Sequence, residues 1–347
     1  MKLLRAIGSP FVSERYLPKD GNIMLELYAQ ASKNKIGLLY LHTLKEHGLE
    51  QLKEICKVEK EKQRELLTTA LRFSKLLNNL GADYAIFKSI PLYPHVPNDV
   101  DIILFDDSKK FENIINFVLK NGYKIIGEVP LETWLHDLRK EDHMIPGKKD
   151  VYDIDLYREL GAVNIIYLDK TKLKKYVAKT KLFGENIKVL RPGMELAVIV
   201  MHSVFPEQIF TLHLYYATLH YLSKMNAEDI KDFISIAKEN NITFAVKTVI
   251  SLIAILHEAA HGFIPEKLKT LTSELRLNNF ETNKLQKKLL KTPHKYMFLT
   301  IIITLLEKMR EKKAAKSILW QMLKMSNPKT IWYVAGVVIE RRRRETY

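Results

Sequence analysis

The sequence predicts an α+β fold in which a small mixed β-sheet lies between N-terminal helices and a larger C-terminal helical domain. Three observations support this class. Apolar residues recur at helical spacing before residue 80, short strand-like runs surround one amphipathic helix in the middle third, and helical spacing returns after Pro192. We therefore expect an N-terminal helical segment (1–80), a sheet-containing core (81–190) and a C-terminal helical domain (191–347).

The N-terminal helices are predicted from the spacing of apolar side chains. Met24, Leu27 and Tyr28 lie three or four positions apart, as on one face of a helix, and residues 59–79 form a longer amphipathic run. Gly81 follows that run directly, and glycine is a common residue just beyond a helix end. The first segment therefore ends where the period of the sequence changes.

The core begins with two short apolar runs, 83–87 and 100–105, which we interpret as strands of a buried sheet. A loop with three prolines separates them: Pro91, Pro94 and Pro97. Asp106, Asp107 and Ser108 are candidate N-caps for a helix through residue 121.

Further strands are expected later in the core. Gly122 ends the predicted helix before a strand at 123–129, whereas the stretch around Trp134, His136 and His143 looks irregular. Residues 151–157 predict a strand that carries Asp153 and Asp155 on one face, and 164–168 is a candidate for one more.

Composition sets the class of protein. A chain of 347 residues with 47% hydrophobic and 27% charged residues has the make-up of a folded protein of more than one unit. Cys56 is the single cysteine, and the first residues lack the apolar stretch of a signal peptide, so we expect a cytoplasmic protein. The longest apolar stretches, 249–256 and 296–306, are too short to cross a bilayer, so no membrane partner is expected.

The positive charge is concentrated near the C-terminus. The formal net charge is +15, and residues 263–347 hold 19 Lys and Arg against 7 Asp and Glu, an excess of twelve. Such a concentration favours a polyanionic partner such as RNA, although a solvated cationic face is the alternative. The run Arg341 to Arg344 is open to both interpretations.

Two carboxylates carry the strongest chemical signal. Asp99 and Asp101 are two residues apart at the start of the second predicted strand, so they share one face at a spacing of about 7 Å. Oxygen ligands of this kind suit Mg²⁺, which retains positions for phosphate and water. The pair therefore indicates phosphoryl-transfer chemistry.

These residues resemble the DNA polymerase β-like nucleotidyltransferase superfamily. Its members place a Gly-Ser or Gly-Gly turn about ten residues before an Asp-x-Asp strand, and Lys88-Ser89 followed by Asp99-Val100-Asp101 is similar. An uncharacterised subfamily with a Lys-Gly turn and a Tyr-Pro in the loop is closer still, since Lys88 and Tyr93-Pro94 match it and Ser89 replaces its glycine. The resemblance extends over roughly residues 25–265.

The resemblance implies an activity and a site. It implies a Mg²⁺-dependent nucleotidyltransferase whose nucleotidyltransferase core is at 81–190. The enzyme would move a nucleoside monophosphate from an NTP, with ATP as the expected substrate, to an acceptor hydroxyl. Asp99 and Asp101 would hold two Mg²⁺ ions, and Lys88 and Ser89 would bind the triphosphate. The third carboxylate, a ligand or general base, would be Asp155, with Asp153 as the alternative. RNA is the favoured acceptor because of the C-terminal charge, ahead of a protein or a small molecule.

Two other functions remain open. The first is an inactive transferase fold whose basic helices bind RNA. The second is a zinc metalloprotease, because residues 257–261 match H-E-x-x-H and would place His257 and His261 on one helix face. No further histidine of the extended protease motif follows, and a later acid such as Glu274 would have to be the third ligand. The aromatic and histidine cluster at 212–221 is expected to serve helix packing rather than base stacking.

Overall fold

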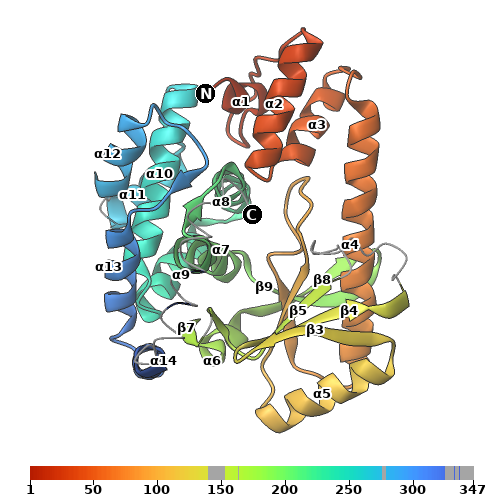
Figure 1. Cartoon of the computed structure of the whole chain (residues 1–347). Helices are drawn as coiled ribbons and strands as arrows, with labels where there is room; N and C mark the ends of the chain where they lie inside the picture. Colours follow the sequence, from red (N-terminus) through yellow and green to blue (C-terminus); the bar gives the residue numbers. More distant parts are fainter. Residues whose placement is uncertain (140–152, 163, 276–278, 325–331, 333–335, 337–347) are drawn as a thin grey trace.

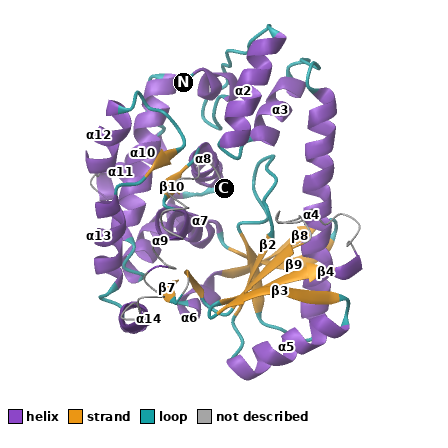
Figure 2. Cartoon of the chain, in the orientation of Figure 1, coloured by secondary structure: helices purple, strands orange, loops and turns teal. Residues whose placement is uncertain are grey.

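The computed structural model confirms the α+β class. It describes residues 1–139, 153–162, 164–275, 279–324, 332 and 336 (Figure 1). Helices surround a seven-stranded mixed sheet, and Figure 2 shows the strands gathered between α5 on one side and α7 and α8 on the other. The proposed division at residues 80 and 190 remains a prediction, although the sheet strands do fall between those limits.

The sheet has the strand order β3-β4-β5-β2-β1-β9-β8. Parallel pairs join β2 to β5 and β1 to β9, and the other neighbours are antiparallel. The strands are β1 (Tyr84–Phe87), β2 (Val100–Leu104), β3 (Tyr123–Val129), β4 (Glu132–Asp137), β5 (Asp153–Tyr157), β8 (Val177–Leu182) and β9 (Glu185–Leu190).

The central strands are buried on both faces. Every residue of β1, β2 and β5 is buried, and alternation divides their side chains between two hydrophobic cores. Ile86, Ile102 and Leu156 pack with α4 (Lys53–Asn79) and α5 (Ser108–Lys120). The opposite face joins the core of the C-terminal helices, and this second face carries Asp101 and Asp155.

The strands around the predicted metal site agree with the sequence analysis, but three other strands of the seven-stranded sheet were missed. The stretch around Trp134 and His136 was expected to be irregular and is β4, which pairs with both β3 and β5. The hairpin β8–β9 at the other edge was not predicted at all. The expected strand at 164–168 is β7 (Ile165–Leu168), which pairs with β6 (Leu160–Ala162) in a separate two-stranded sheet. His143 lies outside the described residues.

Local signals define the N-terminal helices. They are α1 (Lys2–Ile7), α2 (Gly21–Lys33), α3 (Gly37–Glu46) and α4. Helix α4 begins six residues before the predicted run and ends at Asn79, after which Gly81 adopts a positive φ of 59°. The carboxylate of Asp107 caps α5 by accepting the N–H of Lys110, as its position in the sequence suggested.

The C-terminal part is mainly helical, as predicted. Its longer helices are α7 (Pro192–His202), α8 (Leu212–Lys224), α9 (Ala227–Glu239), α10 (Thr243–His261), α11 (Glu266–Leu275), α12 (Asn279–Lys287), α13 (Phe298–Lys308) and α14 (Lys312–Lys324). Short elements connect them or the sheet to them: α6 (Lys170–Leu173), the helical turns Lys174–Tyr176 and Ser203–Glu207, and the strand pair β10 (Ile209–Phe210) with β11 (His294–Lys295).

Helix α10 occupies the middle of this part. Its 19 residues are longer than the apolar stretch 249–256, and by length and composition the helix is sufficient to cross a membrane. However, 67% of its most apolar window is buried against other elements, as in the central helix of a helical core. Around it pack α7, α11, α12 and α13, so α10 is the central packing helix.

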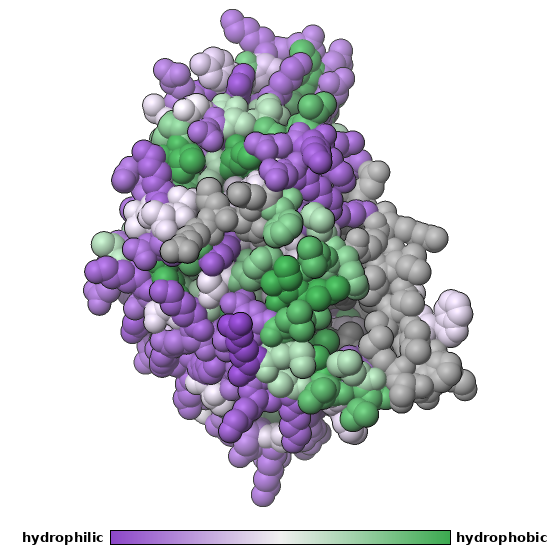
Figure 3. Space-filling view, turned by 90° about the vertical axis from the view of Figure 1, so that its left-hand side faces the viewer, coloured by the Kyte–Doolittle hydropathy of each residue, from purple (hydrophilic) through white to green (hydrophobic). Residues whose placement is uncertain are grey.

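One side of the C-terminal helices is apolar at the surface. Figure 3 shows hydrophobic side chains gathered on the side of the molecule that carries α13. Exposed members on α13 and α14 are Phe298, Leu299, Ile302, Leu306, Leu319, Trp320, Met322 and Leu323. A contiguous apolar surface of this kind is unusual for a side that faces only water.

Candidate active site

Three carboxylates converge on the buried face of the sheet. Asp101 on β2 and Asp155 on β5 are direct neighbours across a parallel strand pair, and Asp99 immediately precedes β2. One oxygen from each lies within 4.8 Å of the others. Asp101 and Asp155 are both 3% exposed, whereas Asp99 is half-buried. In the described part of the chain, this group is the one that has the geometry to hold a metal ion.

The donor atoms fit a hard divalent cation. All three residues offer carboxylate oxygens, and they lie close enough together for one ion to contact all three. Neither a thiolate nor an imidazole belongs to the group, so its chemistry favours Mg²⁺ or Mn²⁺ over zinc.

Asp153 has a different partner. It faces His136 across the β4–β5 pair, and the imidazole Nδ1 lies 2.6 Å from its Oδ1 with both side chains buried. The structure therefore brings Asp155, and not Asp153, together with Asp99 and Asp101. Asp153 and Asp155 are two residues apart on β5, so their carboxylates project from the same face but meet different residues of the neighbouring strands.

Ser89 holds the strand that bears Asp101 in place. Its side chain is completely buried, its Oγ donates to the carbonyl of Phe87 at 3.0 Å, and it accepts the N–H of Asp101 at 2.8 Å. The hydroxyl therefore fixes the end of β1 against β2. This orientation differs from the expected one, in which Ser89 faces the triphosphate.

The turn before Ser89 is also occupied by protein contacts. Lys88 has a positive φ of 58°, and its backbone N–H donates to Oε1 of Glu195 on α7. The N–H of Ser89 donates to the carbonyl of Phe87 at 2.7 Å. Since both turn amides already have acceptors, they do not form the phosphate-binding amide nest that the resemblance implied.

The side chain of Lys88 points into the carboxylate group. Its Nζ lies 2.8 Å from Oδ1 of Asp101, and only 15% of the side chain is exposed. Burial opposes the charge of this ammonium group, but Asp101, Tyr167 and Asp99 together outweigh that cost and raise the pKa of Lys88 above its usual value. The lysine expected to offset phosphate charge thus offsets carboxylate charge.

A second group of polar residues lies behind Lys88. The Nδ1 atom of His202 is 3.5 Å from Lys88 Nζ, and its Nε2 is 3.3 Å from Oε1 of Glu207, which Lys35 also approaches at 3.8 Å. Burial and the nearby Lys88 lower the pKa of His202, so the imidazole is neutral at pH 7. Burial opposes ionisation of Glu207, but Lys35 and His202 lower its pKa overall.

Sequence reasoning missed Glu195, which is buried beside the turn. Burial raises its pKa to about 8, although its contact with the N–H of Lys88 acts in the opposite direction. A signal was present in the sequence, because Glu195 is the single charged residue in the apolar run 193–201. A lone acid in such a run is costly to bury without a specific partner.

The H-E-x-x-H motif is structural in this fold. His257 is fully buried, with Nε2 at 3.0 Å from Ser9 Oγ and Nδ1 at 2.8 Å from the carbonyl of Phe263. Both ring nitrogens therefore contact protein atoms instead of facing a metal. His257 and His261 do not belong to the metal-binding group found in the described residues.

The cluster at 212–221 serves mainly in packing. Tyr215, Tyr216 and Tyr221 are buried, and Tyr93 from the proline loop places its hydroxyl 2.6 Å from Nδ1 of His213. These contacts anchor the loop between β1 and β2 to α8, which agrees with the expected packing role. Residues 341–344 lie outside the described residues.

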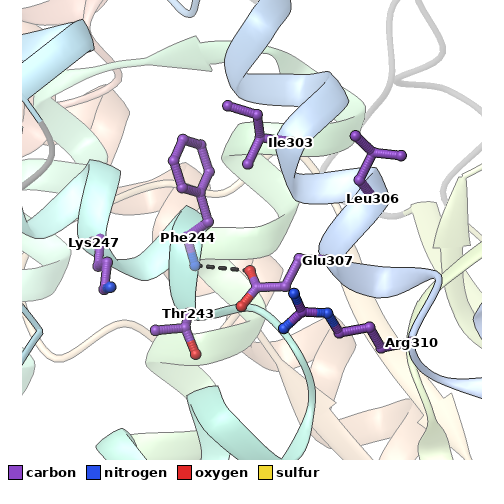
Figure 4. A pocket seen from close by; sticks show the side chains of 7 residues that line it. All are labelled: Thr243, Phe244, Lys247, Ile303, Leu306, Glu307 and Arg310. Carbon is purple, nitrogen blue, oxygen red and sulfur yellow. Dashed lines mark hydrogen bonds between the residues drawn. The ribbon is translucent and has the colours of Figure 1, made fainter.

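A cavity between α10 and α13 is distinct from the carboxylate site. Its wall includes Phe244, Lys247, Leu306 and Arg310 (Figure 4). Glu307, also in the wall, accepts the N–H of Phe244 at 2.8 Å. None of the three clustered aspartates lines it, so this cavity is not part of the candidate active site.

Comparisons with known proteins place few limits on the function. No family model matches the chain, and no curated protein matches it. Among solved structures, the chain is similar to an antigenic nucleotidyltransferase-like protein from Paracoccidioides brasiliensis, at 14% identity over 65% of this chain and 89% of that one, with a TM-score of 0.28. A likeness this distant carries no argument, so function must be argued from the side chains of the site.

Proposed function

We propose that the chain is a nucleotidyltransferase that moves a nucleoside monophosphate from an NTP to an acceptor hydroxyl. One observation carries the proposal: Asp99, Asp101 and Asp155 present oxygens within 4.8 Å of one another on a buried sheet face. Asp101 and Asp155 are buried and Asp99 is half-buried, and the single charge of Lys88 beside Asp101 offsets only part of their combined negative charge, so the group favours a further cation. Such a site is suited to a metal ion that contacts phosphate.

The residues divide the chemistry among them. Asp99, Asp101 and Asp155 would hold Mg²⁺, which stabilises negative charge on the phosphate oxygens and on the leaving group when bound. The acceptor oxygen forms a bond to the α-phosphorus, the bond to the β-phosphate bridging oxygen breaks, and pyrophosphate leaves. Asp155 is our candidate to accept the proton of the acceptor hydroxyl, because its carboxylate lies with those of Asp99 and Asp101, whereas Asp153 faces His136.

In this proposal the turn at Lys88 and Ser89 does not bind the triphosphate. The amides of Lys88 and Ser89 and the hydroxyl of Ser89 contact protein atoms, so the turn positions the strand that bears Asp101. We therefore propose that the triphosphate is held chiefly by cations at the carboxylate group. ATP remains the NTP of first choice.

RNA is the proposed acceptor, on the basis of charge. The excess of twelve positive charges in residues 263–347 favours a polyanion over a protein or small-molecule acceptor. An RNA-binding protein that has lost transfer activity is the second candidate, and the same excess of positive charge supports it. The zinc protease is not supported, because both ring nitrogens of His257 contact protein atoms.

The test is transfer of label from [α-³²P]NTPs to cellular RNA in the presence of Mg²⁺, with the wild type and with Asp99→Ala and Asp101→Ala. We expect labelled RNA with the wild type and none with either variant, because each substitution removes a metal ligand. Glu185→Ala is the matched control, since its carboxylate at the start of β9 is exposed and pairs with Lys75 of α4. Wild-type turnover by Asp99→Ala would exclude this site as the catalytic one.

A further inference from the structure

The position of Lys88 bears on how many metal ions the site holds. Its Nζ lies 2.8 Å from Asp101 Oδ1, and its side chain is largely withdrawn from solvent. The aromatic rings of Phe87 and Tyr157 lie 5.2 and 5.8 Å from the ammonium nitrogen. The charge is therefore inside the carboxylate group and not on a flexible arm in water.

The backbone supports this placement. Lys88 adopts a left-handed conformation that non-glycine residues seldom occupy, and the buried Glu195 accepts its N–H. The next residue, Ser89, is bonded to both neighbouring strands. Because Glu195 fixes the backbone of Lys88 and the two strands fix Ser89, the turn orients the Lys88 side chain toward Asp101.

The charges of the site balance with a single divalent ion. When the three carboxylates are ionised they carry a formal charge of −3, Lys88 contributes +1, and one divalent cation completes neutrality. A second divalent ion would leave an excess of +2 in a site where two of the three ligands are 3% exposed. Little water is available there to offset such an excess.

We propose that the ammonium group of Lys88 is a resident cation that takes the place of one of two metal ions, so that the carboxylate group of the free protein holds one divalent ion. This inference rests on the proposed function, because it concerns the same carboxylates. It differs from the two-ion site that the family resemblance implied. Lys88 thereby becomes a residue that sets the metal content of the site, in addition to its position in the turn.

Metal counting tests this proposal without any measurement of turnover. Mn²⁺ is titrated into the full-length protein, and the free ion is measured by electron paramagnetic resonance to give the number bound. We expect one Mn²⁺ per chain for the wild type and for Lys88→Arg, which retains the charge. Lys88→Met removes the charge at similar length, so one ion leaves a formal charge of −1 and a second would leave +1 instead of the +2 of the wild type, and we expect the second ion to bind. Lys75→Met is the control, because Lys75 pairs with Glu185 at the surface, and it should bind one.

The outcomes separate the two proposals. Two ions on the wild type, or one on Lys88→Met with an unchanged circular dichroism spectrum, would overturn the role of Lys88 while leaving the metal site intact. If Lys88→Met fails to fold, the counts for the wild type and Lys88→Arg still decide, since two ions on either would overturn the role. No bound Mn²⁺ on any of these proteins would overturn the metal site itself, and the proposed function with it.

Discussion

The carboxylate group predicts an unusual effect on stability. Asp155→Asn should make the metal-free protein more stable, although Asp155 is buried and functional. In the wild type, ionised groups within 4.8 Å of one another repel by ~3 kcal/mol per pair at an effective dielectric constant of about 20. The substitution removes the repulsion of Asp155 by Asp99 and Asp101 while retaining the shape of the side chain.

The net gain is smaller than the sum of these repulsions. Lys88 attracts all three carboxylates, so part of the repulsion is already offset, and we expect a gain of about 1–2 kcal/mol in the free energy of unfolding. Asp101→Asn should be less favourable than Asp155→Asn, because it also removes the 2.8 Å ion pair with Lys88. Loss of a partner from a buried pair typically costs several kcal/mol, which offsets the relief of repulsion.

The assay is urea unfolding in EDTA and again in excess Mg²⁺. In EDTA the expected order of stability is Asp155→Asn above wild type, with Asp101→Asn below Asp155→Asn. Mg²⁺ should stabilise the wild type most, because a ligand that binds only the folded state adds to stability. Glu185→Gln, which changes an exposed carboxylate at the start of β9, should alter stability little. The reasoning is refuted if Asp155→Asn in EDTA is no more stable than the wild type.

Two further predictions concern Glu195 beside the turn and the positive charge of residues 263–347. Burial raises the pKa of Glu195 to about 8 from a usual value of 4.5, so the folded state binds this proton more tightly than the unfolded state does. Stability should therefore fall as pH rises from 4.5 to 8, and Glu195→Gln should flatten that fall in urea titrations; an equally steep fall in the variant would contradict it. RNA affinity should fall by ~0.7 log units per log unit of salt for each contacted phosphate. Replacing residues 341–344 with alanine should reduce that slope by the amount expected for several phosphate contacts, and Lys312→Ala by the amount for one contact at most. Fluorescence anisotropy across a salt series measures both slopes. Binding that is insensitive to salt would favour a protein or small-molecule acceptor.

Much of the fold was predictable because its signals are local. The apolar runs of β1 and β2, the Asp107 cap of α5 and the glycine after α4 each depend on neighbouring residues alone. The strands that were missed have weaker local signals. Edge strand β8 contains two exposed lysines, and β4 begins and ends with a charged residue, so each is stabilised mainly by the strand beside it.

The site, too, was predictable where its signals are local and not where they depend on strand pairing. The spacing of Asp99 and Asp101 is a property of one strand, so the sequence alone determined that they share a face. The choice between Asp153 and Asp155 depended on the register of β5 against β2 and β4, which pairs one aspartate with Asp101 and the other with His136. Parallel pairing joins segments more than 50 residues apart, and no local pattern specifies it.

The role of the turn was decided only by tertiary contacts. The sequence placed Lys88 and Ser89 beside the metal-binding strand, but it left the direction of their side chains open. Glu195, more than 100 residues later, accepts the N–H of Lys88, and Asp101 pairs with its ammonium group. Side-chain direction follows from the lowest-energy set of buried partners, and those partners come together only when α7 packs against the sheet.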